Sequence, residues 1–399
     1  MPSVTKNDYL CTQQWNKEKA TGHKIEIMNQ REGMMKRALF TVVAAMMLAT
    51  ALQAQTLPIK GSIVKPTDKN IQYIGRVSFA NPERPRFNFP GTQIIAAFEG
   101  TSLKMMARPE SGYFMAQIDG REAFKVSFNA KRDSVVTLAT ALMPGRHTVK
   151  LMYCIEGLFR HPEFWGFVLD EGCSLSTPPA PSERKIEFIG NSITCGYGVE
   201  HTKKEAPFED ETENHFYTYA TLTAQALGAQ HTAIARSGIG IYRNYDGPKT
   251  GNKDCMPWQY EYTLFNDHSE QWDFSRWQPQ LVCINLGTND LSTPNFDITL
   301  YDKGYRQFLK TVRGHYPKAK IVLCTGPMLG EKEAAQQRKV LDAICRDANK
   351  AGDTEVFRFD FSFQTGDLMY GASWHPSYWQ QQKMAGELIA FLRPLMKWW

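Results

Sequence analysis

A serine stands at the end of an apolar strand pattern, in a setting that suits nucleophilic attack. Residues 186–190 alternate as a buried strand does, and Asn191 and Ser192 then lead into a turn rich in glycine. In open α/β sheets, ligands bind beyond the carboxyl ends of the strands, which is where this serine would lie. Neighbouring glycines let the backbone approach a substrate and leave N–H groups free to face it. The pattern predicts a nucleophile at Ser192; the alternative is an ordinary serine in a strand-to-helix turn.

A serine that attacks a carbonyl needs a base to take its proton and donors for the oxyanion that forms. Groups of both kinds follow three later predicted strands, in residues 237–240, 287–290 and 374–377. Gly238 offers a backbone N–H, Asn289 a side-chain amide and His375 an imidazole. Because parallel strands end at the same edge of a sheet, we expect these groups to meet Ser192 there. Taken singly, each has a plainer explanation: a tight turn, a helix cap or a packed histidine.

The strands that would position these groups belong to an alternating pattern of strands and helices. Helical periodicity appears near 214–227, 299–315, 331–350 and 377–397, among strands predicted at 185–189, 231–235, 281–286, 320–324 and 355–359. Such alternation predicts right-handed βαβ units and a parallel sheet. The core strands are almost wholly apolar, which fits a sheet covered by helices on both faces. We therefore predict a three-layer α/β domain over residues 184–399.

The region before this domain has a different hydrophobic periodicity. Over residues 57–175, short alternating runs are separated by Gly, Pro, Asn and Asp, with turns at Gly100, Asp119-Gly120 and Pro144-Gly145. Many short strands joined by turns predict a β-sandwich, of which the jelly roll is one form. Residues 176–183 are rich in Pro and Ser and are predicted to be a linker.

The amino-terminal segment has the pattern of an export signal. A basic start precedes an apolar run over residues 38–52 and a small-residue cleavage region, so residues 34–54 are predicted to be a signal peptide. The apolar run is shorter than the roughly 20 residues that a membrane span needs. We therefore expect a secreted or periplasmic protein with no membrane span in its mature form; the alternative is a signal anchor with a cytoplasmic tail. Translation is expected to start at Met34 or Met35, which makes residues 1–33 an upstream segment from a misassigned start codon.

Composition and spacing exclude several classes of function. The 399 residues carry a net charge of +5 and no dense run of lysine and arginine, so binding to nucleic acid is not expected. Neither the third glycine of a dinucleotide-binding loop nor a phosphate-binding Gly-Lys-Ser/Thr is present. The spacings Cys-x-x-Cys and His-x-x-x-His are absent, so no metal site is predicted. Among the cysteines, only Cys154 and Cys173 form a pair to test as a disulfide.

Taken together, four blocks of the second region resemble those of the SGNH, or GDSL-type, hydrolases. They read Gly-Asn-Ser, Ser-Gly-Ile-Gly, Gly-Thr-Asn-Asp and His-Pro-Ser, at residues 190–192, 237–240, 287–290 and 375–377. The first block has Asn where that superfamily usually has Asp. Runs similar to the jelly-roll domain of the family-two carbohydrate esterases lie at residues 87–92, 98–103 and 118–120. The resemblance therefore spans most of residues 70–399.

This resemblance implies a set of roles and an activity. Ser192 would be the nucleophile and His375 the general base. The oxyanion hole would consist of the Ser192 N–H, the Gly238 N–H and the Asn289 side chain. The implied reaction removes acetyl groups, through an acyl-enzyme, from the sugar hydroxyls of plant polysaccharides such as xylan or mannan. It needs no cofactor, and the partner it implies is an acetylated polysaccharide or oligosaccharide.

One position departs from the pattern of many SGNH enzymes, which place an Asp three residues before the His. Here that position is Ala372, followed by Ser373, and neither Asp360 nor Asp367 has the expected spacing. Some family-two esterases, which this chain resembles, use a Ser–His dyad in which a backbone carbonyl holds the imidazole. We expect such a dyad here, because a partner of the imidazole mainly determines its orientation and tautomer.

Aromatic residues in the loops around these blocks suit stacking on sugar rings. Trp374, Trp258 and Tyr242 are predicted to bind substrate, and Tyr245 and Trp272 lie in similar loops. Packing between the two domains is the alternative explanation for these aromatic residues. Two other functions stay open: a lipase- or thioesterase-type hydrolase on the same frame, and a non-catalytic carbohydrate-binding protein. The lack of an obvious apolar lid disfavours the first, and the intact set of reactive groups disfavours the second.

Overall fold

The strand that precedes Ser192 lies inside a five-stranded parallel sheet. The computed structural model describes residues 59–132, 134–157 and 160–399. The sheet has the order β12-β11-β15-β16-β17. Its strands are β11 (Lys185–Gly190), β12 (Gln230–Ala235), β15 (Leu281–Asn285), β16 (Lys320–Thr325) and β17 (Val356–Asp360). The chain adds β12 on one side of β11 and then β15 on the other, so the crevice for a ligand is expected beyond the ends of β11 and β15.

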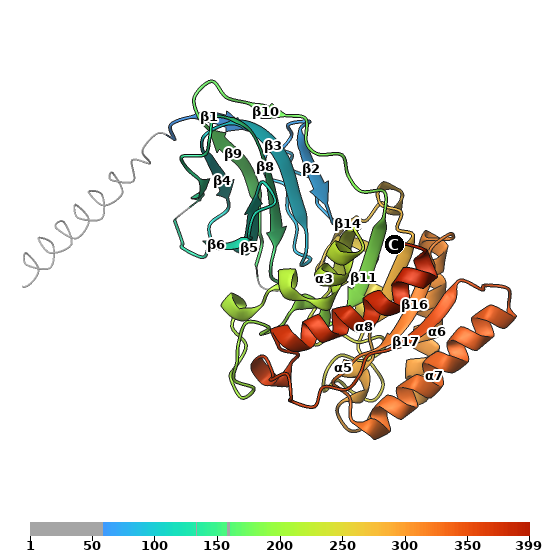
Figure 1. The fold of residues 1–399 in the computed structure, drawn as a ribbon. Helices are drawn as coiled ribbons and strands as arrows, with labels where there is room; N and C mark the ends of the chain where they lie inside the picture. Colours follow the sequence, from blue (N-terminus) through green and yellow to red (C-terminus); the bar gives the residue numbers. More distant parts are fainter. Residues whose placement is uncertain (1–58, 133, 158–159) are drawn as a thin grey trace, which may run out of the picture. The chain divides into compact units, whose positions relative to one another are not determined.

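Helices cover both faces of this sheet. α3 (Tyr219–Ala226) and α8 (Tyr378–Met396) cover one face, and α6 (Ile298–His315) and α7 (Glu331–Lys350) cover the other (Figure 1). Successive strand residues point to opposite faces, so Phe188 packs in the cluster that contains α8, and Ile189 packs in the cluster that contains α6. Because both faces are buried, the central strands β15 and β16 are mostly apolar. The predicted three-layer α/β fold with a parallel sheet is confirmed.

Capping side chains determine where two of these helices begin. The Asp297 carboxylate accepts hydrogen bonds from the N–H groups of Thr299 (2.9 Å) and Leu300 (3.2 Å), so α6 starts one residue before its predicted start. The helix predicted from residue 214 begins instead at Tyr219, after a capping bond to the Thr218 side chain. The residues before it form a separate 3₁₀ turn, η2 (His215–Tyr217), which has its own cap.

Residues before the α/β domain form the predicted β-sandwich, built from two antiparallel sheets with a shared apolar core. One sheet has the order β1-β9-β4-β7: β1 (Ser62–Val64), β9 (Phe164–Leu169), β4 (Leu103–Ala107) and β7 (Val135–Ala139). The other has the order β10-β3-β8-β5-β6, with β2 also paired to β3: β10 (Leu175–Ser176), β3 (Gln93–Gly100), β8 (Gly145–Tyr153), β5 (Gly112–Ile118), β6 (Phe124–Phe128) and β2 (Ile71–Ile74). The β-sandwich prediction is confirmed.

Short elements complete the part of the chain that the structure describes. Three are single-turn helices: α2 (Ser192–Cys195), α4 (Met256–Gln259) and α5 (Thr288–Leu291). A small antiparallel hairpin consists of β13 (Tyr262–Leu264) and β14 (Asp267–Gln271). The remaining 3₁₀ turns are η1 (Asp210–Thr212), η3 (Phe274–Arg276) and η4 (Ala372–Trp374). All three short helices and η4 carry or adjoin predicted site residues.

The sandwich and the α/β part share one compact unit over residues 60–399, held together by buried polar contacts. The Arg76 guanidinium donates to the backbone carbonyls of Tyr260 and Tyr262, the second at 2.8 Å. Asn88 exchanges two hydrogen bonds with the backbone of Phe265, at 2.9 and 2.8 Å. A shift of one part against the other would break these hydrogen bonds, so these pairs favour one arrangement of the two parts.

The disulfide considered between Cys154 and Cys173 is not formed; both cysteines are free. Cys173 lies beside Gly100, which pairs with Gly145 at the start of β8. Cys154 comes directly after Tyr153, at the other end of this nine-residue strand. At about 3.3 Å per residue, the two cysteines are separated by nearly the length of the strand. A disulfide requires Cα atoms within about 7 Å, so the pairing was wrong.

The predicted signal peptide over residues 34–54, like residues 1–33, lies outside the residues that the structure describes. Among the described residues, no helix combines the length and apolar character needed to cross a membrane.

Candidate active site

Ser192 is the first residue of α2, immediately after the turn that ends β11. The side chain of Asn191 accepts a hydrogen bond from the Ile193 N–H at 3.1 Å and so caps the short helix. At Gly190, an added Cβ would lie 2.0 Å from the Thr194 Oγ1, so only glycine allows the chain to turn this closely. Tight turning places Ser192 at the carboxyl edge of the sheet, as expected from the sequence.

His375 lies within hydrogen-bonding distance of Ser192, although 183 residues separate them. Its Nε2 is 2.8 Å from the Ser192 Oγ, while its Nδ1 is 3.0 Å from the Ser373 carbonyl oxygen and 3.2 Å from that of Ala372. A carbonyl oxygen can only accept, so the proton is assigned to Nδ1, and Nε2 faces the serine with its lone pair. The arrangement can remove a proton from the serine hydroxyl.

The turn before His375 has an unusual backbone conformation. Ser373 and Trp374 have φ values of 48° and 62°, in the left-handed region that non-glycine residues rarely adopt. The Ser373 N–H donates to the Ala206 carbonyl at 3.2 Å, and the Trp374 N–H donates to that of Lys204 at 3.1 Å. These bonds hold the turn in the conformation that directs its carbonyl oxygens at the imidazole. Strain that neighbouring contacts sustain in this way is typical of functional sites.

Burial keeps His375 uncharged near neutral pH. Desolvation lowers the pKa of its imidazole to about 4, and the hydrogen bonds to the carbonyls of Ala372 and Ser373 offset only part of that effect. The unprotonated form that can accept a proton is therefore the dominant form at pH 7.

No carboxylate among the described residues accepts a hydrogen bond from His375. The Asp360 carboxylate accepts from the Arg358 guanidinium at 2.7 Å, and the Asp367 carboxylate accepts from the Thr365 hydroxyl at 2.8 Å. Both aspartates are exposed and engaged elsewhere. The hydrogen-bonding partners of the imidazole among the described residues are thus the serine hydroxyl and two backbone carbonyls.

Three hydrogen-bond donors lie in the segments around Ser192. Among the described residues, neither the Ser192 N–H nor the Gly238 N–H has an acceptor. Gly238 has a φ of 74°, and a Cβ added there would meet nothing within 4 Å, so this glycine borders open space. The Asn289 side-chain amide donates to the Ile239 carbonyl at 2.8 Å, which leaves its second N–H free for a ligand. That bond also ties Asn289 to the loop that contains Gly238.

The helix-cap explanation for Asn289 and Asp290 is wrong. The N-cap of α5 is Gly287, and no side chain caps the helix. The buried Asp290 carboxylate instead accepts from the backbone N–H groups of Ile241 (2.9 Å), Tyr242 (2.9 Å) and Arg243 (3.2 Å). Burial raises its pKa to about 6, although these bonds act in the opposite direction. Sequence reasoning missed this role for Asp290, which anchors the loop after β12.

Tyr197 is a second residue that sequence reasoning missed. Its ring stacks on the His375 imidazole, with centroids 4.1 Å apart and planes at 26°, and its other side faces Phe208 at 4.4 Å. The stack fixes the imidazole plane and shields one of its faces from water. The available signal was the aromatic residue between two glycines, five residues after Ser192.

The aromatic residues predicted to bind substrate divide into two groups. The side chains of Trp374 and Trp258 are 50% and 52% exposed. Trp258 lies on α4, which contacts the loop after β12 through a hydrogen bond from the Met256 N–H to the Gly240 carbonyl (2.9 Å). Tyr242 is only 9% exposed, packs in the core, and accepts a hydrogen bond from the Asp297 N–H. Trp272 is also in the core. A buried ring cannot offer its face to a sugar, so the prediction for Tyr242 is wrong.

Family models match both parts of the chain. Residues 73–179 match the carbohydrate esterase 2 N-terminal domain, and residues 188–382 match the GDSL-like lipase/acylhydrolase family. The site and fold therefore define a GDSL-type hydrolase with an accessory β-sandwich. A structure of a family two carbohydrate esterase from Clostridium thermocellum in complex with cellohexaose is 37% identical, with a TM-score of 0.77. The match covers 82% of this chain and all of that one, and the chain belongs to the family-two carbohydrate esterases.

Curated relatives agree with this assignment. The chain is 38% identical over 330 residues to the cellulase/esterase CelE of Acetivibrio thermocellus, in a match that covers 82% of this chain and 40% of that protein. It is 29% identical over 377 residues to an acetylxylan esterase / glucomannan deacetylase of Cellvibrio japonicus, covering 90% of this chain and 98% of the relative. The chain is thus a carboxylic-ester hydrolase of the carbohydrate esterase class, and it spans less than half of the length of CelE.

Proposed function

We propose that this protein removes O-acetyl groups from a plant polysaccharide of the xylan or mannan type, using a Ser192–His375 dyad. The observation that carries the proposal is the pair of contacts at His375: Nε2 lies 2.8 Å from the Ser192 hydroxyl, and Nδ1 lies 3.0 Å from a backbone carbonyl. A base held in one tautomer and one orientation is what activation of a serine requires.

The reaction follows from these positions. The Ser192 Oγ attacks the acetyl carbonyl carbon while its proton passes to Nε2 of His375. The carbonyl oxygen becomes an oxyanion, which accepts hydrogen bonds from the Ser192 and Gly238 N–H groups and the Asn289 amide. When the tetrahedral intermediate collapses, the sugar oxygen leaves and takes the proton from His375, and an acetyl-enzyme remains.

A water molecule completes the cycle. His375 takes a proton from the water, whose oxygen attacks the acetyl-enzyme carbonyl, and the same donors stabilise the second oxyanion. Collapse returns the proton from the imidazole to the Ser192 oxygen and releases acetic acid, which ionises to acetate in solution. No cofactor takes part in this sequence of steps.

The substrate class rests on the relatives and on the exposed aromatic residues. Matched proteins are named as an acetylxylan esterase / glucomannan deacetylase and as an esterase in complex with cellohexaose. Trp374 directly precedes His375 and is half exposed, and Trp258 is similarly exposed. We assign both as faces on which the pyranose rings stack. Export through the predicted signal peptide would bring the enzyme to its polysaccharide.

Two assays test the proposal. Purified protein is incubated with a chromogenic acetate and a chromogenic octanoate, and then with acetylated xylan, mannan and glucomannan, with product NMR to locate the hydroxyl. Preference for the acetate with acetyl release from a polysaccharide supports the proposal. Preference for the octanoate would indicate a lipase-type hydrolase, and absence of turnover with retained polysaccharide binding would indicate a non-catalytic binder.

A further inference from the structure

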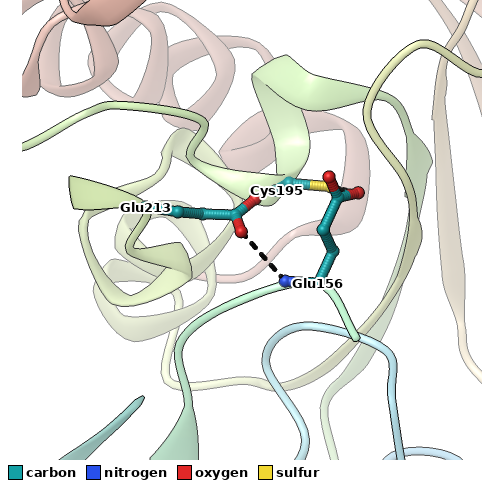
Figure 2. Close-up of side chains that lie close together, drawn as sticks. All are labelled: Glu156, Cys195 and Glu213. Atoms are coloured by element: carbon teal, nitrogen blue, oxygen red, sulfur yellow. Dashed lines mark hydrogen bonds between the residues drawn. The ribbon is translucent and has the colours of Figure 1, made fainter. Parts of the chain in front are cut away.

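A carboxyl group from the β-sandwich reaches the loops around the site. Glu156 lies in the loop after β8 and is buried. Its carboxylate accepts a hydrogen bond from the Ser237 N–H, and its Oε2 is 3.4 Å from the Cys195 Sγ. Figure 2 shows the Glu156 carboxyl group against the sulfur of Cys195. None of the sequence motifs includes Glu156.

The two partners of Glu156 belong to the two segments that the proposed reaction uses first. Ser237 is the residue before Gly238, so the direction of its N–H affects the position of the next peptide group. Cys195 is the last residue of α2, the helix turn that Ser192 begins. One carboxyl group therefore contacts both the segment with the proposed nucleophile and the segment with a proposed oxyanion donor.

A second buried carboxyl group holds Glu156 in place. Oε2 of Glu213 accepts a hydrogen bond from the Glu156 N–H at 3.1 Å, a contact drawn in Figure 2. Its Oε1 has no partner among the described residues, and the whole side chain is inaccessible to solvent. Burial raises the pKa of Glu156 and raises that of Glu213 well above its ordinary value, so the pair is not expected to carry two full charges.

A metal ion is the alternative occupant of this cluster. One potential ligand atom from each of Glu156, Cys195 and Glu213 lies within 4.8 Å of the others, a spacing that a cation could bridge. However, the Ser237 N–H, the Glu156 N–H and the Cys195 thiol all point at these carboxylate oxygens. Hydrogen-bond donors repel a cation and stabilise an acceptor. The contacts therefore favour a hydrogen-bonded clamp over a metal site.

We propose that Glu156 is a positioning residue for ester hydrolysis. Its carboxyl group ties the Ser237 amide to the end of α2, and so holds the Gly238 N–H at the distance from Ser192 that oxyanion binding requires. This inference rests on the proposed roles of Ser192 and Gly238. It also gives the sandwich a part in the chemistry, because the residue that joins the two segments comes from a sandwich loop.

Variants of Glu156 distinguish the effect of side-chain length from the effect of the carboxyl group. Glu156→Gln keeps the length of the side chain and an oxygen that can accept from the Ser237 N–H, so kcat should stay within about threefold of wild type. Glu156→Asp keeps the carboxyl group but shortens the side chain by one methylene. Because a misplacement of about 1 Å can cost on the order of a hundredfold in rate, Glu156→Asp and Glu156→Ala should lower kcat by about 10- to 100-fold. The KM should change by less than about threefold in all three, since Glu156 does not contact the sugar.

Asn88→Ala is the matched control. It removes a buried contact between the sandwich and the α/β part, at Phe265, without touching the segments of Ser192 or Gly238. It should lower the melting temperature while kcat stays within about twofold of wild type. An equal loss of kcat in Asn88→Ala and Glu156→Asp would overturn the inference, because loosening of the whole contact would then explain both.

Three further outcomes decide the matter. Full kcat in a folded Glu156→Asp variant contradicts the inference, and so does a loss in Glu156→Gln as large as that in Glu156→Asp. Elemental analysis of the purified wild-type protein should find no stoichiometric metal; one metal ion per chain that is lost in Cys195→Ala would replace the clamp with a metal site. Activity in Ser192→Ala would instead reject the proposed function, whatever the Glu156 variants do.

Discussion

The Nδ1 atom of His375 lies 3.0 Å from the carbonyl oxygen of Ser373, two residues earlier in the same turn. This contact occupies the side of the imidazole opposite to Ser192, where many serine hydrolases place a carboxylate. A carbonyl oxygen determines the tautomer as a carboxylate does, but it adds no full negative charge that would raise the pKa of the imidazole. The left-handed backbone at Ser373 and Trp374 is the local cause of this geometry.

If the Ser373 carbonyl is sufficient to orient His375, neither Asp360 nor Asp367 should contribute to catalysis. Asp360→Asn and Asp367→Asn should each leave kcat within about tenfold of wild type, or about 1.4 kcal/mol in activation free energy. His375→Ala should reduce kcat by several orders of magnitude, as loss of the base does in other serine hydrolases. Steady-state kinetics on a chromogenic acetate measures all three. A folded aspartate variant as inactive as His375→Ala would contradict the dyad.

The amide of Asn289 should act mainly in the transition state. Asn289→Ala should lower kcat on the order of a hundredfold with little change in KM, because the oxyanion exists only after attack has begun. The variant also loses the bond to the Ile239 carbonyl, so its melting temperature is measured in parallel. A loss confined to KM or to the melting temperature would indicate a structural role instead.

The stack of Tyr197 on His375 should influence the pKa of the imidazole. Tyr197→Ala opens one face of the ring to water, which weakens the desolvation and moves the pKa of His375 upward from about 4. The acidic limb of the kcat/KM profile should shift to higher pH, and kcat should fall by about tenfold as the ring loses its orientation. Tyr197→Phe keeps the ring and serves as the control; an unshifted profile in Tyr197→Ala would refute the shielding role.

The pH profile of the wild-type enzyme follows from the same shift. The base works in its unprotonated form, and burial lowers the pKa of His375 from 6.5 to about 4. In the free enzyme, kcat/KM should therefore stay near its plateau as pH falls through 6.5, and should halve only near pH 4. A half-maximum near pH 6.5 would mean that the imidazole is solvated.

Acid also affects the fold, so stability is the control for this profile. Burial lowers the pKa of His215 to about 4 and that of His231 well below its ordinary value. Each of these histidines has a lower pKa in the folded state than in the unfolded state. At a pH between its folded-state and unfolded-state pKa, the unfolded state binds more protons, so the stability of the fold should decrease as pH drops from 6.5 toward 4. Melting temperatures at each pH identify the range in which the kinetics report on His375 alone.

Most strands and helices of the α/β domain could be predicted, because the hydrophobic pattern of each segment matches the burial of its side chains in the fold. β11 and β15 are mostly apolar on both faces, and the 20-residue α7 has the length and periodicity that identify a helix from sequence. Ser192, Gly238, Asn289 and His375 each follow a strand of one sheet, so their convergence followed from topology.

Other features depend on contacts between distant segments. Nothing local distinguishes the buried Tyr242 from the exposed Trp258, because exposure of an aromatic ring depends on what packs over it. Glu156 looks like an ordinary charged residue of a sandwich loop, and its burial becomes visible only when that loop meets Ser237. The carbonyl that orients His375 is a backbone group, which every residue carries, so the residue types did not identify it.

Acetyl release by Ser192→Ala tests the central claim most directly. The hydroxyl contacts His375 at the edge of the sheet and does not fill a packed core, so the variant should fold with an unchanged melting temperature. On the best acetylated polysaccharide, its rate should fall below about a thousandth of the wild-type rate, since only binding and the oxyanion donors would remain. A folded Ser192→Ala protein that releases acetate faster than this would show that another group is the nucleophile.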